Sequence, residues 1–148
     1  MKSLEPARLP HGPEFCFVDR VLARRPGRNV VGCLDLDTHT SRPTWTGALP
    51  PAYILEAMIQ TCGLIFFAPS AGEAPGAPPM VVALDRVRWT EPQKARQTPE
   101  RVVSRCRFLG RAGAFLRFRC IARAPDGRRL ASGDVTLQAP AAPRDGEL

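Results

Sequence analysis

One acidic side chain stands alone in the most apolar segment of the chain. Glu56 is the only acidic residue in residues 51–67, a segment that would place apolar residues on every side of a helix. An unpaired carboxylate is costly to bury and is usually retained only with a partner or a function. A carboxyl group in apolar surroundings also keeps its proton to higher pH, so Glu56 is a candidate proton donor. A structural alternative stays open, because an acid near the amino end of a helix suits the helix dipole.

Two other polar residues, Gln60 and His39, are candidates to act near this carboxyl group. Gln60 follows Glu56 by four residues and shares its helical face, where its amide can hydrogen-bond the carboxyl group or a neighbour. His39 lies between two threonines before the helix and is a candidate general base facing Glu56, from the same chain or a second one. A solvated loop histidine is its alternative. His11 lies in a turn of prolines and a glycine, where a structural role is the better interpretation.

The expected elements place these residues around one helix. Residues 51–67 predict a helix buried on all sides, begun by a proline that suits the first helical position. Residues 38–51 and 68–79 are rich in residues typical of loops. Apolar runs and period-two alternation predict strands over residues 15–22, 29–37, 80–89, 101–108, 114–122 and 130–137.

This order predicts an α+β protein with one buried helix wrapped by a long antiparallel sheet. The edges of such a sheet need cover, so we expect a dimer that shares its sheet. The 148 residues suffice for one domain, which we expect over residues 1–138, with a disordered proline-rich tail over residues 139–148.

Composition excludes several classes of protein. Hydrophobic residues make up 44% and charged residues 24% of the chain, which excludes a wholly disordered protein, a collagen and a coiled coil. No run of 18 apolar residues occurs, so no membrane-spanning helix is expected. The first nine residues lack the apolar core of a secretion signal, and we expect a cytoplasmic location.

Charge and cysteine content argue against nucleic acid and metal. The net charge is +7, but the arginines are dispersed and form no block with interleaved aromatic residues, so no nucleic-acid partner is expected. The five cysteines form no C-x-x-C pair and only two histidines are present. We therefore expect reduced, buried cysteines and no metal site.

Three segments resemble the β-hydroxyacyl-acyl-carrier-protein dehydratase family, whose members have the hotdog fold. Residues 9–13 (LPHGP) followed by residues 18–22 (VDRVL) are similar to the opening of that family. Residues 49–60 (LPPAYILEAMIQ) resemble its central helix, and residues 82–89 (VALDRVRW) resemble its next strand. The resemblance covers about residues 9–138 and favours the divergent dehydratase-like proteins of polyketide and aryl-polyene pathways.

The resemblance implies a reaction, a carrier and an assembly. It implies loss of water from 3-hydroxyacyl thioesters in fatty acid or polyketide biosynthesis. The substrate would be delivered on the phosphopantetheine of an acyl carrier protein, without another cofactor. A histidine would remove the α-proton, and an acid on the helix of the other subunit, matched here by Glu56, would help the hydroxyl group leave. The amino end of that helix would face the thioester oxygen.

The chain departs from this pattern at the histidine. The family places it fourteen residues before the helix acid, where this chain has Arg42, which cannot act as a base at neutral pH. His39, three residues away, is then the candidate base. Pro51 replaces a glycine of the family at the helix start and removes one N–H group.

Three functions therefore stay open. The first is an active dehydratase with Glu56 as acid and His39 as base. The second is a catalytically weak hotdog subunit that binds acyl chains or completes a heterodimer. The third is a hotdog thioesterase in which Glu56 activates a water molecule.

Substrate and carrier would contact further residues. An acyl chain needs an apolar tunnel, which Cys62 and Phe66 could also help to line. The candidate substrate-binding residues are Trp45, Tyr53, Met58 and Gln60. The candidate residues for docking an acidic carrier protein are Arg86, Arg88 and Arg96. Ordinary core packing and a solvated surface are the respective alternatives.

Overall fold

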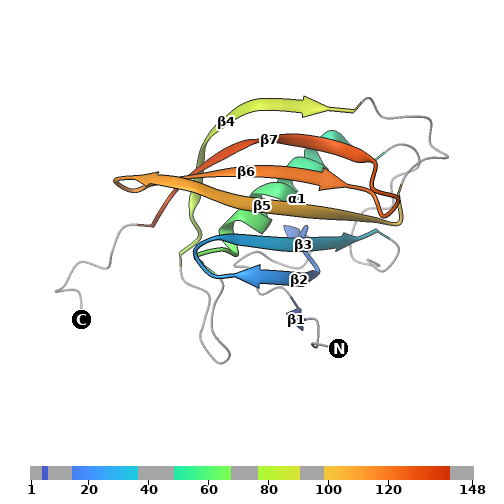
Figure 1. Ribbon diagram of the computed structural model, residues 1–148, viewed down its shortest axis with the longest axis horizontal. Helices are drawn as coiled ribbons and strands as arrows, with labels where there is room; N and C mark the ends of the chain where they lie inside the picture. Colours follow the sequence, from blue (N-terminus) through green and yellow to red (C-terminus); the bar gives the residue numbers. More distant parts are fainter. Residues whose placement is uncertain (1–4, 7–14, 37–48, 68–76, 91–98, 141–148) are drawn as a thin grey trace.

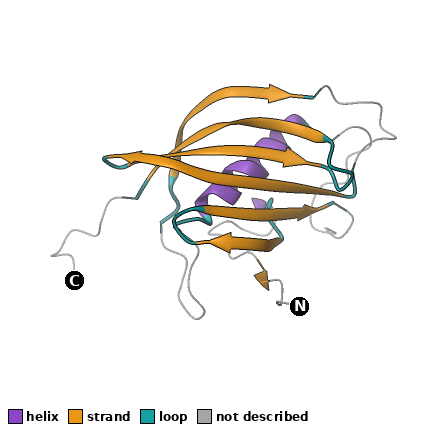
Figure 2. Ribbon diagram, viewed as in Figure 1, coloured by secondary structure: helices purple, strands orange, loops and turns teal. Residues whose placement is uncertain are grey.

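One helix lies against one face of a curved antiparallel sheet in the computed structural model (Figure 1, Figure 2). The structure describes residues 5–6, 15–36, 49–67, 77–90 and 99–140. The helix α1 (Pro51–Gly63) packs against four strands: β3 (Asn29–Asp35), β5 (Arg101–Ala112), β6 (Phe115–Arg123) and β7 (Arg129–Gln138). The predicted α+β architecture, with one helix against a long antiparallel sheet, is confirmed.

Within the described residues the sheet has seven strands, and each neighbouring pair is antiparallel. Its spatial order is β1-β2-β3-β5-β6-β7-β4, so the strand that follows the helix crosses to the far edge. The strands are β1 (Glu5–Pro6), β2 (Arg20–Arg25), β3 (Asn29–Asp35), β4 (Met80–Trp89), β5 (Arg101–Ala112), β6 (Phe115–Arg123) and β7 (Arg129–Gln138).

Several predicted boundaries are wrong: β2 ends at Arg25 and not at residue 22, and β5 ends at Ala112 and not at residue 108. Two further differences have identifiable reasons. The first long strand begins at Arg20 rather than at residue 15, because the backbone N–H of Phe17 donates to the Gln60 side chain instead of joining a ladder. The helix ends at Gly63 rather than at residue 67. Beyond it the backbone tightens, and Leu64 and Ile65 donate to carbonyl groups three residues back.

Alternation along the strands separates a helix-covered face from an outer face. On β6, Leu116, Phe118, Cys120 and Ala122 are buried, whereas the residues between them are mostly exposed arginines. This is the period-two pattern of a sheet with one covered face. Gly32 on β3 allows the helix to approach closely, because a Cβ atom there would lie 2.5 Å from Thr61 Oγ1.

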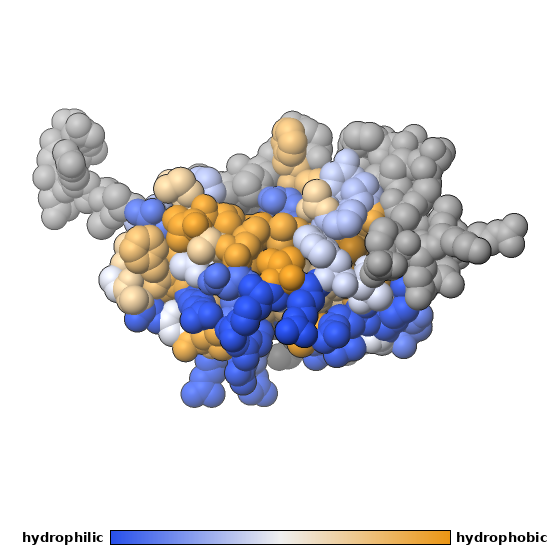
Figure 3. All heavy atoms as spheres, turned by 90° about the horizontal axis from the view of Figure 1, so that it is seen from above, coloured by the Kyte–Doolittle hydropathy of each residue, from blue (hydrophilic) through white to orange (hydrophobic). Residues whose placement is uncertain are grey.

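The edge strand β4 exposes apolar side chains over most of its length. Met80 is 60% exposed, and four other large apolar residues of β4 are also exposed: Val81, Val82, Leu84 and Trp89. Figure 3, which views the molecule from the β4 edge, shows this apolar surface beside the hydrophilic side chains of the outer face. No helix within the described part of the chain is long and apolar enough to span a membrane.

Candidate functional site

The candidate site is built on the first half of α1, around Glu56. Pro50 precedes the helix and Pro51 opens it, so the first turn starts without these two N–H groups. Glu56 lies in the next turn and is half-buried, with Leu55 and Ile59 also only partly covered. The expectation of a helix buried on all sides is therefore wrong for a single chain, because its sheet covers only one side of α1.

Gln60 holds the carboxyl group of Glu56 in place. Its Nε2 donates to Glu56 Oε1 at 2.9 Å and to the backbone oxygen of Phe15 at 2.7 Å. Its Oε1 accepts the backbone N–H of Phe17 at 2.8 Å. Both amide protons are thus used, and the buried side chain joins the helix to residues 15–17. The predicted Glu56–Gln60 contact is confirmed.

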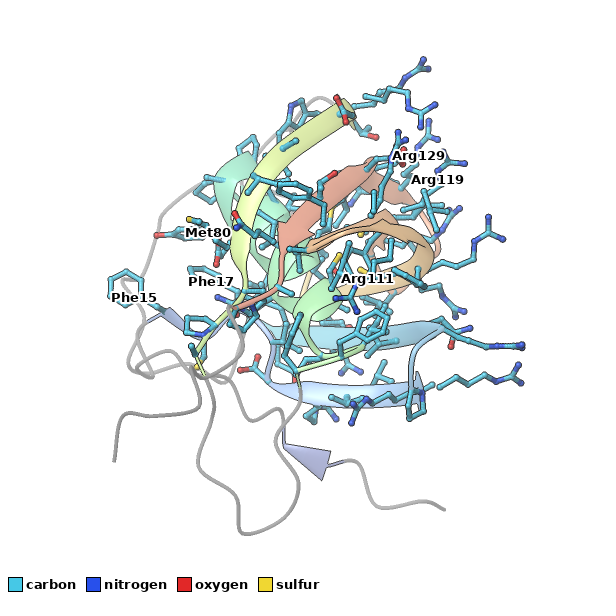
Figure 4. All side chains as sticks on the ribbon, turned by 90° about the vertical axis from the view of Figure 1, so that its left-hand side faces the viewer. Phe15, Phe17, Met80, Arg111, Arg119 and Arg129 are labelled. Atoms are coloured by element: carbon cyan, nitrogen blue, oxygen red, sulfur yellow. The ribbon has the colours of Figure 1, made fainter. Side chains whose placement is uncertain are left out.

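Aromatic side chains flank this pair. The ring of Phe17 packs against that of Tyr53 with centroids 4.9 Å apart. Tyr53 precedes Glu56 by three residues, so both share one side of α1. Phe15 is exposed, and Figure 4 shows it with Phe17 and Met80 on one side of the molecule. The site therefore combines a fixed carboxyl group with apolar surface.

The other predicted substrate-binding residues are separated from this cluster or lie outside the described residues. Met58 is fully buried and faces the sheet, where its carbonyl oxygen accepts a hydrogen bond from Cys106. Trp45 and the two histidines, His39 and His11, lie outside the described residues, as does Arg96. Their roles stay predictions.

The predicted docking residues on β4 lie in a different environment. Arg86, in the left-handed region with φ of +52°, forms an ion pair with Asp134 of β7. Arg117 and Arg119 of β6 bond the same carboxylate. Hydrogen bonds from Arg119, followed by those from Arg86, lower the pKa of Asp134 to about 2 against the opposing effect of its burial. Arg88 is exposed on β4.

The cluster around Asp134 is not predicted by the sequence. Its members lie on three strands and become neighbours only once the register places Arg119 opposite Asp134. A lone acid amid the arginine-rich strands was the available signal. A second missed feature is the meeting of Cys62, Cys106 and Cys120 in the core, whose sulfur atoms lie within 4.8 Å of one another.

Known proteins resemble this chain in sequence and in fold. No protein-family model matches the chain. Over 90 residues the chain is 33% identical to the 3-hydroxyacyl-[acyl-carrier-protein] dehydratase FabZ of Psychromonas ingrahamii. The match covers 57% of this chain and 59% of that relative, so the chain matches about three fifths of the length of the relative.

Solved structures agree on the fold. The dehydratase heterocomplex ApeI:P from Xenorhabdus doucetiae matches with a TM-score of 0.70 at 20% identity, covering 90% of this chain and 88% of that one. A hypothetical thioesterase from Streptococcus pneumoniae, solved with coenzyme A, matches with a TM-score of 0.59 at 12% identity, covering 82% and 84%.

The chain therefore has the hotdog fold, as expected from its sequence. Within that fold it is dehydratase-like, and its resemblance to the β-hydroxyacyl-acyl-carrier-protein dehydratases is confirmed by the match to FabZ.

Proposed function

We propose that this chain is a dehydratase subunit acting on 3-hydroxyacyl thioesters carried by acyl carrier protein, in fatty acid or polyketide biosynthesis in the cytoplasm. The observation that carries the proposal is the Glu56 carboxyl group, fixed by Gln60 in the first half of α1 and flanked by apolar side chains. It occupies the helix position that corresponds to the acid of the β-hydroxyacyl-acyl-carrier-protein dehydratases, the family that the sequence resembles.

In the proposed reaction one group removes a proton from the substrate and another group donates a proton to it. A base removes the α-proton of the substrate, and the electron pair forms the carbon–carbon double bond as the carbon–oxygen bond breaks. Glu56 gives its proton to the departing hydroxyl group, which leaves as water. Gln60 keeps the carboxyl group aimed, since its amide is itself held by the backbone of residues 15–17.

His39 is the proposed base of an active enzyme. Imidazole suits proton removal near neutral pH, whereas the arginine at the family's histidine position does not. In the resembling family the base and the acid come from different subunits, so His39 of one copy would serve Glu56 of the other.

The edge strand β4 is the proposed dimer contact. Its outer edge lacks a partner strand within the described chain, and it exposes Met80, Val81 and Val82 in succession. An unpaired, apolar edge strand is a template for pairing with another strand. Two β4 strands joined in this way would produce a dimer with a shared sheet.

A heterodimer is the second candidate assembly. The replacement of the family's histidine by Arg42 favours a chain that receives its base from a different hotdog subunit. The similar ApeI:P structure is itself a dehydratase heterocomplex. In that case this chain would bind acyl groups and supply Glu56, while a partner would supply the histidine.

Thioester hydrolysis is the third candidate activity. The hypothetical thioesterase from Streptococcus pneumoniae shares the fold. The half-buried Glu56 carboxyl group could activate a water molecule for attack on the thioester carbonyl carbon.

An acidic carrier would meet arginines of this chain. The proposed docking residues are Arg86, Arg88 and Arg96. The guanidinium group of Arg86 also forms an ion pair with Asp134. Long-range attraction of this kind is screened by salt. Carrier affinity should therefore fall between low and moderate salt, and an unchanged affinity would contradict electrostatic docking.

The deciding experiment compares Glu56→Gln with Glu100→Gln, an exposed acid outside the cluster. Both variants and wild type are assayed for water loss from a carrier-bound 3-hydroxyacyl thioester, with free thiol measured in parallel to detect hydrolysis. Loss of a general acid should lower kcat about 100-fold or more for Glu56→Gln, with Glu100→Gln unchanged.

His39→Ala separates the first two candidates. A wild type active alone and a His39→Ala variant inactive alone support the active enzyme. A wild type that is inactive alone but active with a second hotdog subunit supports the heterodimer. Equal activity of wild type and Glu56→Gln would contradict every candidate that uses this carboxyl group.

A further inference from the structure

Three cysteine side chains meet in the core between the helix and the sheet. Cys62 comes from α1, Cys106 from β5 and Cys120 from β6, and each is at most 2% exposed. Their sulfur atoms all lie within 4.8 Å of one another, and those of Cys62 and Cys120 are 3.0 Å apart. A buried cysteine behaves as a small apolar residue and needs no sulfur neighbour. Core packing alone therefore does not require three thiols to meet.

The fold fixes this arrangement through regular elements. Cys106 lies directly opposite Cys120 in the β5–β6 ladder, on the helix-covered face. Cys62 follows Met58 by one helical turn, and the Met58 carbonyl oxygen accepts a hydrogen bond from the Cys106 thiol at 3.5 Å. Since a helix and two paired strands hold the three sulfur atoms, their proximity does not depend on a loop.

Sulfur separation favours a covalent bond over a shared metal ion. Zinc–thiolate bonds are about 2.3 Å long, so two thiolates on one centre lie roughly 3.8–4.0 Å apart. The 3.0 Å between Cys62 and Cys120 is shorter than that. A disulfide bond of about 2.05 Å needs the two sulfur atoms to approach by about 1 Å. Closed structural zinc sites also use four protein ligands, and this cluster offers three among the described residues.

The three thiols differ in reactivity. The neighbouring thiols lower the pKa of Cys120, whereas burial raises the pKa of Cys62 and of Cys106. The thiolate is the nucleophilic form of cysteine. Cys120 is therefore assigned as the sulfur that attacks, and Cys62, whose sulfur atom lies 3.0 Å from it, as the one that closes the bond.

We infer that Cys62 and Cys120 form a disulfide bond when the protein meets hydrogen peroxide, which cross-links α1 to β6. The Cys120 thiolate attacks one peroxide oxygen, so a sulfur–oxygen bond forms and the oxygen–oxygen bond breaks. The departing hydroxide takes a proton and leaves as water. The Cys62 sulfur then attacks Cys120 Sγ, the sulfur–oxygen bond breaks, and the second hydroxide leaves as water with the Cys62 proton. Two electrons pass from the two sulfur atoms to the peroxide.

The cross-link bears on the candidate site through the helix. Glu56 lies six residues before Cys62 on α1, so the bond would fix the carboxyl-terminal half of the helix that carries Glu56. Because the thiols are almost fully buried, peroxide reaches them only when the structure opens locally. Disulfide formation should then be slower than oxidation of Cys16, which is partly exposed.

The test is peptide mapping of the full-length wild-type protein after hydrogen peroxide treatment. Free thiols are alkylated in denaturant without reductant, and disulfide-linked peptides are identified by mass spectrometry. We expect a Cys62–Cys120 linked peptide, its loss on adding dithiothreitol, and a Tm higher by roughly 5–10 °C for the oxidised protein.

Three variants sharpen the test. Cys120→Ala should abolish the linked peptide, and Cys106→Ala should retain it, because Cys106 is not a partner in the bond. Cys33→Ala is the matched control, since Cys33 is equally buried outside the cluster and burial raises its pKa to about 11.

Three results with the wild-type protein would overturn the inference, two from the peptide map and one from elemental analysis. One is full alkylation of Cys62 and Cys120 after peroxide treatment, with oxidation confined to Cys16. Another is a linked peptide that contains Cys106 in place of either partner. A third is stoichiometric zinc or copper in the purified protein that protects all three thiols.

Discussion

The two faces of the sheet are stabilised by different interactions. The helix-covered face packs apolar side chains such as Phe118 and Val135 with almost no exposure. The outer face of the same strands carries Arg117 and Arg119, whose charges meet at one buried acid, Asp134. Figure 4 shows this separation, with Arg119 and Arg129 on the side opposite Phe15 and Phe17. Shape complementarity dominates the first face, and a few ion pairs organise the second.

Truncation of one aromatic residue on each face of β6 should give the largest contrast. Phe118 is fully buried and packs edge-on or tilted against Phe66 and Phe108, whereas Phe115 on the same strand is 47% exposed. Phe118→Ala should destabilise the protein by about 3–5 kcal/mol, and Phe115→Ala by less than about 1 kcal/mol. Urea denaturation measures both. Equal losses for the two variants would mean that β6 does not divide the faces as described.

A methyl group added at the helix contact should have the next largest effect. In Gly32→Ala the new Cβ would lie 2.5 Å from Thr61 Oγ1, and that hydroxyl already donates to the Ala57 carbonyl oxygen at 2.6 Å. Overpacking of this kind costs about 1–3 kcal/mol. Gly110→Ala is the matched control, since nothing lies within 4 Å of its added Cβ. Chemical denaturation should show little change for the control, and a neutral Gly32→Ala would argue against close helix packing.

Sequence periodicity predicted the helix-covered face better than it predicted the outer face. Burial at every second residue of β6 is a local property, so alternation sufficed to predict that strand. The start of β2 depends on Gln60, which takes the N–H of Phe17 from 43 residues away, and no local pattern contains that bond. The same applies to Asp134, whose three arginine partners come from two other strands.

The candidate site likewise has a part that the sequence predicts and a part that depends on the tertiary fold. Glu56 and Gln60 were predictable as a pair because helical spacing alone places them together. The anchoring of Gln60 by residues 15–17 and the meeting of three cysteines require the tertiary fold. Sequence therefore predicts which chemical groups are present more reliably than it predicts what holds them.

Neutralising the acid of the outer face should have a moderate, pH-dependent effect. Asp134 has its pKa lowered from 3.8 to about 2, so its ionised form stabilises the folded state. That contribution is complete above pH 4 and is lost as the pH falls through 2. Since the arginines around it are about half exposed, solvent screening reduces the expected loss in Asp134→Asn to about 1 kcal/mol at pH 7.

The measurement is the free energy of unfolding at pH 7 and at pH 2. The gap between wild type and Asp134→Asn should narrow on acidification. Asp126→Asn, at an exposed turn position, is the control and should differ little from wild type at either pH. A gap that stays constant with pH would assign the loss to packing and not to charge.

Removing one arginine of the outer face should have the smallest effect on the free energy of unfolding, and it should stabilise the protein where the other substitutions destabilise it. Arg107 lies directly opposite Arg119 in the β5–β6 ladder, and Arg119 is already paired with Asp134. Like charges in this position repel each other, so Arg107→Gln should stabilise the fold by a few tenths of a kcal/mol at low salt. The gain should vanish near 1 M salt, where charges at this distance are screened. Stabilisation that persists at high salt would indicate that the outer face, like the covered one, is governed by packing.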